Sequence, residues 1–165
     1  SNQTRFEESA PDGLYDYEIR TPLKAMGSLA FVLGKYGIVS ADYEYIDYTT
    51  ARLRASDYNF SEENNAIKDY FQSASNIRIG TEWKAGIFAL RGGYNMYGSP
   101  YKGADKMGAR TGYSFGFGIR EKAYFVDFSF SHTSTELDYY IYNISPVAKN
   151  KVNSNAYSVT LGFRM

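Results

Sequence analysis

Hydrophobic and polar residues alternate along most of the chain, with the period of two that a two-faced β-strand requires. The first clear run is 23–33, in which Leu23, Leu29 and Phe31 lie on one face and Lys24 and Ser28 lie on the other. Similar runs occur at 39–45, 76–84, 88–96, 112–120, 124–131 and 157–165. The pattern predicts an all-β fold, an antiparallel up-and-down meander of seven strands.

Charged residues inside these runs fall opposite the large apolar side chains. In the run 76–84, Ile79 and Trp83 share one face while Arg78 and Glu82 share the other. Such a face suits a water-filled lumen, and the candidates for it are Asp42, Glu44, Arg78, Glu82, Arg91 and Asp127. They could form a network that lines a path or holds a plug, or they could simply be solvated in a polar interior.

One predicted strand is nearly bare on its polar side, because Gly112, Gly116 and Gly118 alternate there with aromatic residues. These glycines could make room for a plug or a substrate, or they could permit curvature of the sheet.

The connections alternate between short and long. Short turns are predicted around 35–37, 84–86 and 120–122, and long loops at about 49–75, 98–110 and 133–154. Outer-membrane β-barrels show this asymmetry, and strands of about 10 residues tilted by about 45° span their apolar band. The sequence therefore predicts part of a transmembrane barrel in a Gram-negative outer membrane. The alternative is a soluble sandwich or lipocalin-like barrel, but a lipocalin turns its apolar face inward.

Composition agrees with this interpretation. Aromatic residues make up 18% of the chain, yet the mean hydropathy is −0.44. The net charge is zero without a basic run, which argues against nucleic acid as a partner. The absence of cysteine excludes a disulfide scaffold and thiolate metal sites. We expect no metal and no cofactor.

The chain divides into two parts by this pattern. Residues 1–13 are expected to be a tag remnant and an outer-loop segment, and residues 14–165 the C-terminal strands of a barrel. Bacterial barrels have an even number of strands, so seven strands indicate a fragment unless 14–20 folds back as an eighth. Pro22 could mark such a break. We expect instead that 14–20 continues into 23–33 as one long strand protruding from the membrane.

Within the first long loop, Ser61 is predicted to cap a short helix, with Glu62 and Glu63 near its positive end. At the other end of the chain, the run 157–165 resembles the C-terminal signal that the barrel assembly machinery reads, although Met165 stands where an aromatic residue is usual. The alternative for this run is an ordinary terminal edge strand.

A second resemblance covers residues 17–48. An extended stretch enters a strand through Thr21-Pro22, a tight turn follows, and the return strand alternates as Asp42-Tyr43-Glu44-Tyr45. This arrangement resembles the FadL/TodX family of outer-membrane transporters for hydrophobic compounds, some members of which are labelled hemin receptors. The resemblance implies a fourteen-stranded barrel with an N-terminal hatch, of which this chain supplies the last half. It also implies passive diffusion of long-chain fatty acids or other hydrophobic molecules, in contact with outer-membrane lipid.

The family captures its ligands at the outer loops, and apolar side chains occur in the corresponding loops here. The ligand-capture candidates are Ile67, Tyr70, Phe71, Tyr139, Tyr140 and Tyr142. An aromatic girdle or packing between loops would explain the same residues.

His132 is the only histidine and is followed at alternate positions by Ser134 and Glu136. A serine, a base and an orienting acid are the parts of a serine hydrolase, so a small outer-membrane lipid hydrolase is an alternative function, as is a structural or adhesive barrel. Serine is common in this chain, and an exposed histidine at the membrane interface explains the pattern better than a catalytic one. We therefore expect no enzymatic activity, and no haem ligand at His132.

Overall fold

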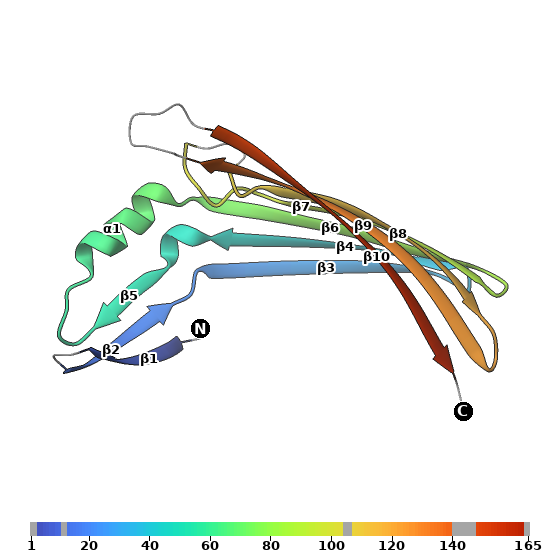
Figure 1. Cartoon of the computed structure of the whole chain (residues 1–165), viewed down its shortest axis with the longest axis horizontal. Coiled ribbons are helices and arrows are strands. Elements are labelled where there is room, and N and C mark those ends of the chain that lie inside the picture. Colours follow the sequence, from blue (N-terminus) through green and yellow to red (C-terminus); the bar gives the residue numbers. More distant parts are fainter. Residues whose placement is uncertain (1–2, 11–12, 104–106, 140–147, 164–165) are drawn as a thin grey trace.

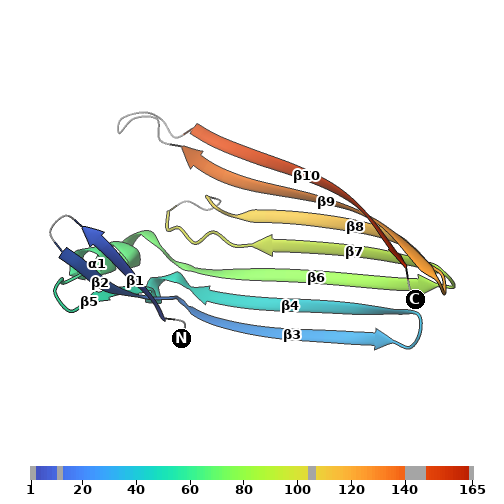
Figure 2. The ribbon, with the colours of Figure 1, turned by 60° about the horizontal axis from the view of Figure 1, so that its bottom comes forward.

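Seven long strands form one antiparallel sheet in the computed structural model, which describes residues 3–10, 13–103, 107–139 and 148–163. The order across the sheet is β10-β9-β8-β7-β6-β4-β3, so each strand lies beside the next long strand of the chain (Figure 2). The bounds are β3 Leu23–Leu33, β4 Gly37–Asp47, β6 Ser73–Ala85, β7 Phe88–Tyr97, β8 Arg110–Arg120, β9 Tyr124–Tyr139 and β10 Ala148–Phe163. The predicted seven-stranded meander is confirmed.

Short turns join the strands at one end of the sheet. Gly34 and Gly86 adopt positive φ values of 55° and 62° in two of these turns, a conformation that residues with a Cβ rarely adopt. A third short turn at 121–123 joins β8 to β9. The longer connections all lie at the opposite end.

The sheet is open among the described residues. β3 and β10 occupy its two edges, and each pairs with a neighbour on one side only. No closed barrel is formed by this part of the chain, which leaves two rows of unpaired backbone groups on the described strands.

A second sheet contains three strands in the order β1-β2-β5: β1 Gln3–Ala10, β2 Gly13–Arg20 and β5 Arg52–Ala55. The expectation that 14–20 continues into β3 as one long strand is wrong. β2 ends before Thr21-Pro22 and pairs with β1 and β5, so it is not an eighth strand of the large sheet either. Proline cannot donate a ladder hydrogen bond, which explains the break at this point.

The long segment after β4 is more ordered than a loop. It contains a 3₁₀ turn η1 (Tyr48–Thr50), β5 and a helix α1 (Ser61–Tyr70). The helix begins where expected, with Glu62 and Glu63 in its first turn, but Ser61 is its first helical residue and not its cap. Phe60 occupies the cap position without a side-chain hydrogen bond.

Helix α1 protects the free edge of β5. The side chain of Asn64 accepts a hydrogen bond from Leu53 N at 2.8 Å and donates one to Leu53 O at 2.9 Å. The amide group therefore pairs with the backbone as a neighbouring strand would. An exposed strand edge is a template for unwanted pairing, and Asn64 covers this one.

The hairpin of β9 and β10 is longer than the sequence indicated. The region 133–154 was expected to be a loop, but β9 extends to Tyr139 and β10 begins at Ala148, with continuous pairing from Tyr124 to Tyr139. The expectation failed because this stretch is polar on both faces, for example at Thr133 and Ser134, so the alternation of apolar and polar residues that marked the other strands is missing.

Figure 1 shows how the parts are arranged. The large sheet is curved along its length, and the small sheet and α1 lie together at the end with the longer connections, while β10 ends at the other. Only two apolar residues are buried among those described, Ala74 and Ala89. The large sheet therefore has no apolar core of its own, and its stability must come from strand pairing and from what contacts its two faces.

Candidate functional site

The register of the large sheet brings all six predicted lumen residues to one face. Residues directly opposite each other on neighbouring strands point to the same side of a sheet. The facing pairs are Asp42 with Arg78, Glu44 with Asn76, Glu82 with Arg91, and Asp127 with Gly118. We call this side the polar face and the other side the apolar face.

Arg91 of β7 joins two carboxylates near the short turns. Its Nε donates a hydrogen bond to Glu82 Oε2 on β6 at 2.6 Å, and its Nη1 donates one to Asp127 Oδ1 on β9 at 2.7 Å. Lys84 Nζ lies 3.2 Å from Glu82 Oε1, and Arg120 Nη2 lies 3.7 Å from Asp127 Oδ2. Hydrogen bonds between ionised groups are stronger than neutral ones. This Arg91 cluster of five residues connects four neighbouring strands.

The bond between Arg91 and Asp127 crosses β8, because the polar face of β8 carries glycine there. A Cβ atom at Gly118 would lie 2.1 Å from Asp127 Oδ1, and one at Gly116 would lie 3.3 Å from the Cβ of Arg91. The glycines thus leave room for side chains of the adjacent strands. This role differs from both explanations that the sequence suggested.

Replacing Gly118 by alanine is expected to push the Asp127 carboxylate away from Arg91 and to lower the free energy of unfolding by about 1–3 kcal/mol. Urea titration of the protein in phospholipid vesicles measures this change. Gly27→Ala is the matched control, because nothing lies within 4 Å of a Cβ at that strand position. Equal stability of the two variants would contradict the crowding argument.

A second group of charges surrounds Glu44, whose exposed fraction is 5%. Lys24 forms an ion pair with Glu44, and Asn76 Nδ2 donates a hydrogen bond to Glu44 Oε1 at 2.8 Å. Arg78 Nε lies 3.5 Å from Asp42 Oδ2 on the same face. A buried carboxylate is tolerated only with such partners. Lys24 and Asn76 were missing from the candidates, since only the register between strands identifies them.

The apolar face is exposed on all seven strands. Leu29 is 69% exposed, Phe115 61% and Leu161 66%. Exposed apolar residues representing the successive strands are Leu29, Tyr43, Ile79, Leu90, Phe115, Phe128 and Leu161. Soluble monomers rarely expose apolar patches that extend this far, so another apolar phase or partner must cover this face.

Charged residues on the apolar face lie at the ends next to the longer connections. Among its described side chains, the charged ones are Asp47, Glu136 and Lys151, and all three are found there. The side chains between these ends and the short turns are apolar or small and uncharged.

The boundary between apolar and polar residues on this face runs obliquely. Residues paired across successive strands form a row that runs across the sheet. The last apolar residue of β3, Leu23, lies in the row that contains Ser73 of β6, whereas the last apolar residue of β10, Tyr157, lies in the row that contains Thr81 of β6. The last apolar residue thus shifts by eight residues across six strand spacings, which is about 26 Å along the strands over about 29 Å across them. The boundary is inclined by about 40° to the perpendicular of the strands. The positions of the short turns along the strands also shift from β3 towards β9, in the same direction as the boundary but by fewer residues.

The three ligand-capture candidates near α1 do not share one environment. Tyr70 is 69% exposed, whereas Phe71 packs against Tyr101 and Tyr48 with ring centroids 5.2 and 6.4 Å apart. Ile67 is half-buried on the helix. Tyr48 and Tyr101 were not among the candidates. Of the other candidates, Tyr140 and Tyr142 lie outside the described residues, as does the side chain of Tyr139.

Two long connections are joined around Phe71. Gln72 N donates a hydrogen bond to Pro100 O at 2.8 Å, and Lys102 N donates one to Tyr70 O at 2.9 Å. These bonds and the contacts between the tilted rings hold the C-terminal end of α1 against the connection between β7 and β8.

His132 projects from the apolar face of β9, close to the oblique boundary. Its Nδ1 lies 2.7 Å from Asn155 Oδ1, and its ring stacks on Tyr113 with a centroid separation of 5.0 Å. Ser134 and Glu136 follow on the same face, and Glu136 is in register with Lys151.

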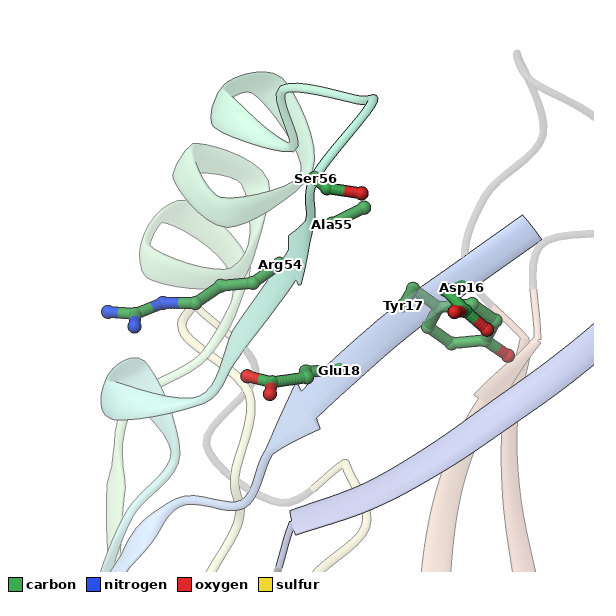
Figure 3. A pocket seen from close by; sticks show the side chains of 6 residues that line it. All are labelled: Asp16, Tyr17, Glu18, Arg54, Ala55 and Ser56. Atoms are coloured by element: carbon green, nitrogen blue, oxygen red, sulfur yellow. The ribbon is translucent and has the colours of Figure 1, made fainter.

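A cavity of about 420 Å³ lies outside the large sheet, between β2 and β5 (Figure 3). It is lined by Asp16, Tyr17, Glu18, Arg54, Ala55 and Ser56. Figure 3 shows that the Arg54 side chain extends away from the side to which Asp16 and Tyr17 project. The charged groups do not converge on a common point, so we assign no chemistry to this cavity.

The geometry defines the class of the protein as a two-faced, antiparallel β-meander with an exposed apolar face and an ion-paired polar face. Comparisons with family models, with curated proteins and with solved structures gave no match to this chain. No helix in the described ranges is long and apolar enough to cross a membrane. The same residues contain no group of three or more His, Cys, Asp or Glu side chains placed to hold a metal ion.

Proposed function

We propose that this chain forms part of the wall of an outer-membrane β-barrel through which hydrophobic small molecules, such as long-chain fatty acids, diffuse passively. The observation that carries the proposal is the apolar face with its oblique boundary. Strands of outer-membrane barrels tilt by about 35–45° from the membrane normal, so a flat membrane surface must cross them obliquely. The inclination of about 40° found here agrees with that tilt.

The distribution of charge supports the same placement. Charges in the middle of the strands are on the polar face, where they form ion pairs and can meet water in a lumen. The apolar face presents lipid with side chains such as Leu90 and Phe115. A basic residue on that face would cost about 2–4 kcal/mol at the midplane of a bilayer.

Backbone groups at both edges of the sheet need partners in a membrane, because unsatisfied groups there cost several kcal/mol each. We propose that further strands pair with β3 and β10 and close the barrel. These strands belong either to the same polypeptide or to another copy.

The assignment of a hydrophobic cargo rests on the resemblance of residues 17–48 to the FadL/TodX family and on the aromatic residues near the long connections. Phe71, Tyr48 and Tyr101 form an apolar cluster there, and Tyr70 is exposed beside it. We propose this region as the place where a hydrophobic molecule first contacts the protein.

Uptake measurements test the function. Cells that lack the gene should take up radiolabelled long-chain fatty acid more slowly than the parent cells, and a plasmid copy should restore the rate. Uptake of a small hydrophilic sugar serves as the control and should not change. Unchanged uptake of a whole panel of hydrophobic compounds would rule out the transport function.

A further inference from the structure

We propose that Ser134, His132 and Asn155 form a hydrolytic site for carboxylic esters of membrane lipids, on the lipid-facing side of the β9–β10 hairpin. This activity is additional to transport, but it rests on the proposed placement of the apolar face in a bilayer. It also differs from the triad that the sequence suggested, in which Glu136 was the orienting group.

The hydrogen bond between His132 and Asn155 is the first observation. The two residues face each other across β9 and β10, and Nδ1 lies 2.7 Å from Oδ1. Because an amide oxygen only accepts, the imidazole donates from Nδ1. In the neutral imidazole, Nε2 is then the nitrogen without a proton and can accept one. Stacking on Tyr113 further restricts the ring. A histidine fixed in this tautomer by a third residue is the arrangement of a general base.

Ser134 supplies the nucleophile. It lies two residues beyond His132 on the same face of β9, about 6.6 Å away along the strand. The imidazole of His132 lies beside Asn155 and Tyr113, so general-base action requires Nε2 to reach Ser134 Oγ in the substrate complex, where catalytic hydrogen bonds that are long in the free protein tighten. Glu136 is four residues from His132 and faces Lys151, so Asn155 takes the orienting role in its place.

A cavity lies next to Ser134. Its volume is about 350 Å³, and its lining includes Ser134, Thr111, Met96, Glu136 and Lys151. Met96 and Thr111 face the same side as Ser134 and provide an uncharged surface, while Glu136 and Lys151, which face each other on β9 and β10, lie at the polar end. An amphipathic ester with an acyl chain and a zwitterionic headgroup, whose two charges can meet Lys151 and Glu136, matches this combination.

The height of the site matches the position of ester groups in a bilayer. Phe130 and Tyr157 form the last apolar row below it, with ring centroids 5.0 Å apart, and His132 with Asn155 forms the next row. Aromatic rings mark the interface between acyl chains and headgroups in membrane barrels. The ester carbonyls of phospholipids lie in the same zone, so a substrate would reach Ser134 without leaving the membrane.

The reaction follows from these groups. Ser134 Oγ attacks the ester carbonyl carbon, and its proton moves to His132 Nε2. The tetrahedral intermediate collapses, the bond to the alcohol oxygen breaks, and His132 returns the proton to the leaving alcohol. Water then attacks the acyl-serine with His132 as the base, which releases the fatty acid and regenerates the serine.

The test uses the whole protein reconstituted in phosphatidylcholine vesicles, with insertion checked by flotation and fatty-acid release as the readout. We expect Ser134→Ala and His132→Ala to lower the rate by about 100-fold or more. Ser131→Ala is the control, because Ser131 is adjacent on β9 but lies on the polar face. It should leave the rate unchanged.

Asn155 is a positioning residue and needs a separate readout. Asn155→Ala should lower the rate by about 10-fold, and Asn155→Asp should restore most of it, since a carboxylate oxygen also accepts from Nδ1. A long-chain alkyl fluorophosphonate should label the peptide that contains Ser134 in the unmodified protein and not in His132→Ala.

Two results would overturn the proposal. One is inserted protein that releases no fatty acid above protein-free vesicles, and the other is release that persists in Ser134→Ala. Neither affects the transport function, which is measured by uptake. Failure of the protein to float with vesicles would remove both the membrane placement and the lipid hydrolysis that depends on it.

Discussion

Replacing Phe128 by arginine is expected to destabilise the protein in a phospholipid bilayer by about 2–4 kcal/mol, the cost of a basic side chain near the middle of an apolar band. Phe128 is 44% exposed on the apolar face and lies between Tyr124 and Phe130 on β9. Urea titration of folded protein in vesicles, followed by tryptophan fluorescence of Trp83, measures the change.

Ser129→Arg is the matched control. Ser129 is the next residue of the same strand and is also exposed, but it lies on the polar face. Its replacement should change the stability by less than about 1 kcal/mol, because an exposed polar position tolerates charge. If the apolar face met water instead of lipid, the two arginine variants would behave alike. The comparison therefore tests the membrane placement independently of transport.

Replacing Arg91 by alanine should lower the free energy of unfolding by about 2 kcal/mol in the same assay. Glu82 and Asp127 would each lose a charge-assisted hydrogen bond, and removing one partner of a buried ion pair costs about 3–5 kcal/mol. The expected value is smaller because the Arg91 side chain is 28% exposed. Arg91→Lys should recover part of the loss, since an ammonium group keeps the charge but not both bonds.

The double variant separates the ion pair from simple packing. Gly118→Ala acts by displacing the carboxylate that Arg91 binds, so it should cost much less when Arg91 is already alanine. Additive effects of the two substitutions would show that the glycine is needed for another reason.

The large sheet could be predicted because each of its strands has one mainly apolar face between the short turns and the oblique boundary. The alternation in Leu23–Leu33 and in the other runs reflects the environment of each strand face. This environment is a local property, so it can be inferred from one strand without knowing its partner. The upper part of β9 could not be found in this way, because Thr133 and Ser134 are both polar. There the strand is maintained by pairing with β10, which is a long-range property.

The small sheet escaped prediction for a related reason. β5 has only four residues, and it is held by β2 on one side and by the Asn64 side chain on the other. Neither contact is visible in a local pattern. Pro22 did indicate a break, but the sequence could not say whether 14–20 continued β3 or paired elsewhere.

The alternation of side chains along each strand was sufficient to identify which charged residues share the polar face. The distances within the Arg91 cluster depend on the register between strands and on the glycines on the polar face of β8. The alternation along a single strand does not give the register or show which side chains those glycines make room for. Asn155 is the clearest case of a site residue that the sequence could not identify. It is 23 residues from His132, and no sequence feature links Asn155 to His132. Only pairing of β9 with β10 places its amide beside the imidazole.

In the proposed membrane placement, the length of the β9–β10 hairpin has a consequence for the outer surface of the cell. Nine residues of β9 follow Phe130, which corresponds to about 30 Å along the strand and a rise of about 20 Å above the apolar band at the inclination found here. In that placement the hairpin forms a ribbon that projects beyond the lipid headgroups. Of the described strands, these two would then be the most accessible to antibodies, phages and external proteases.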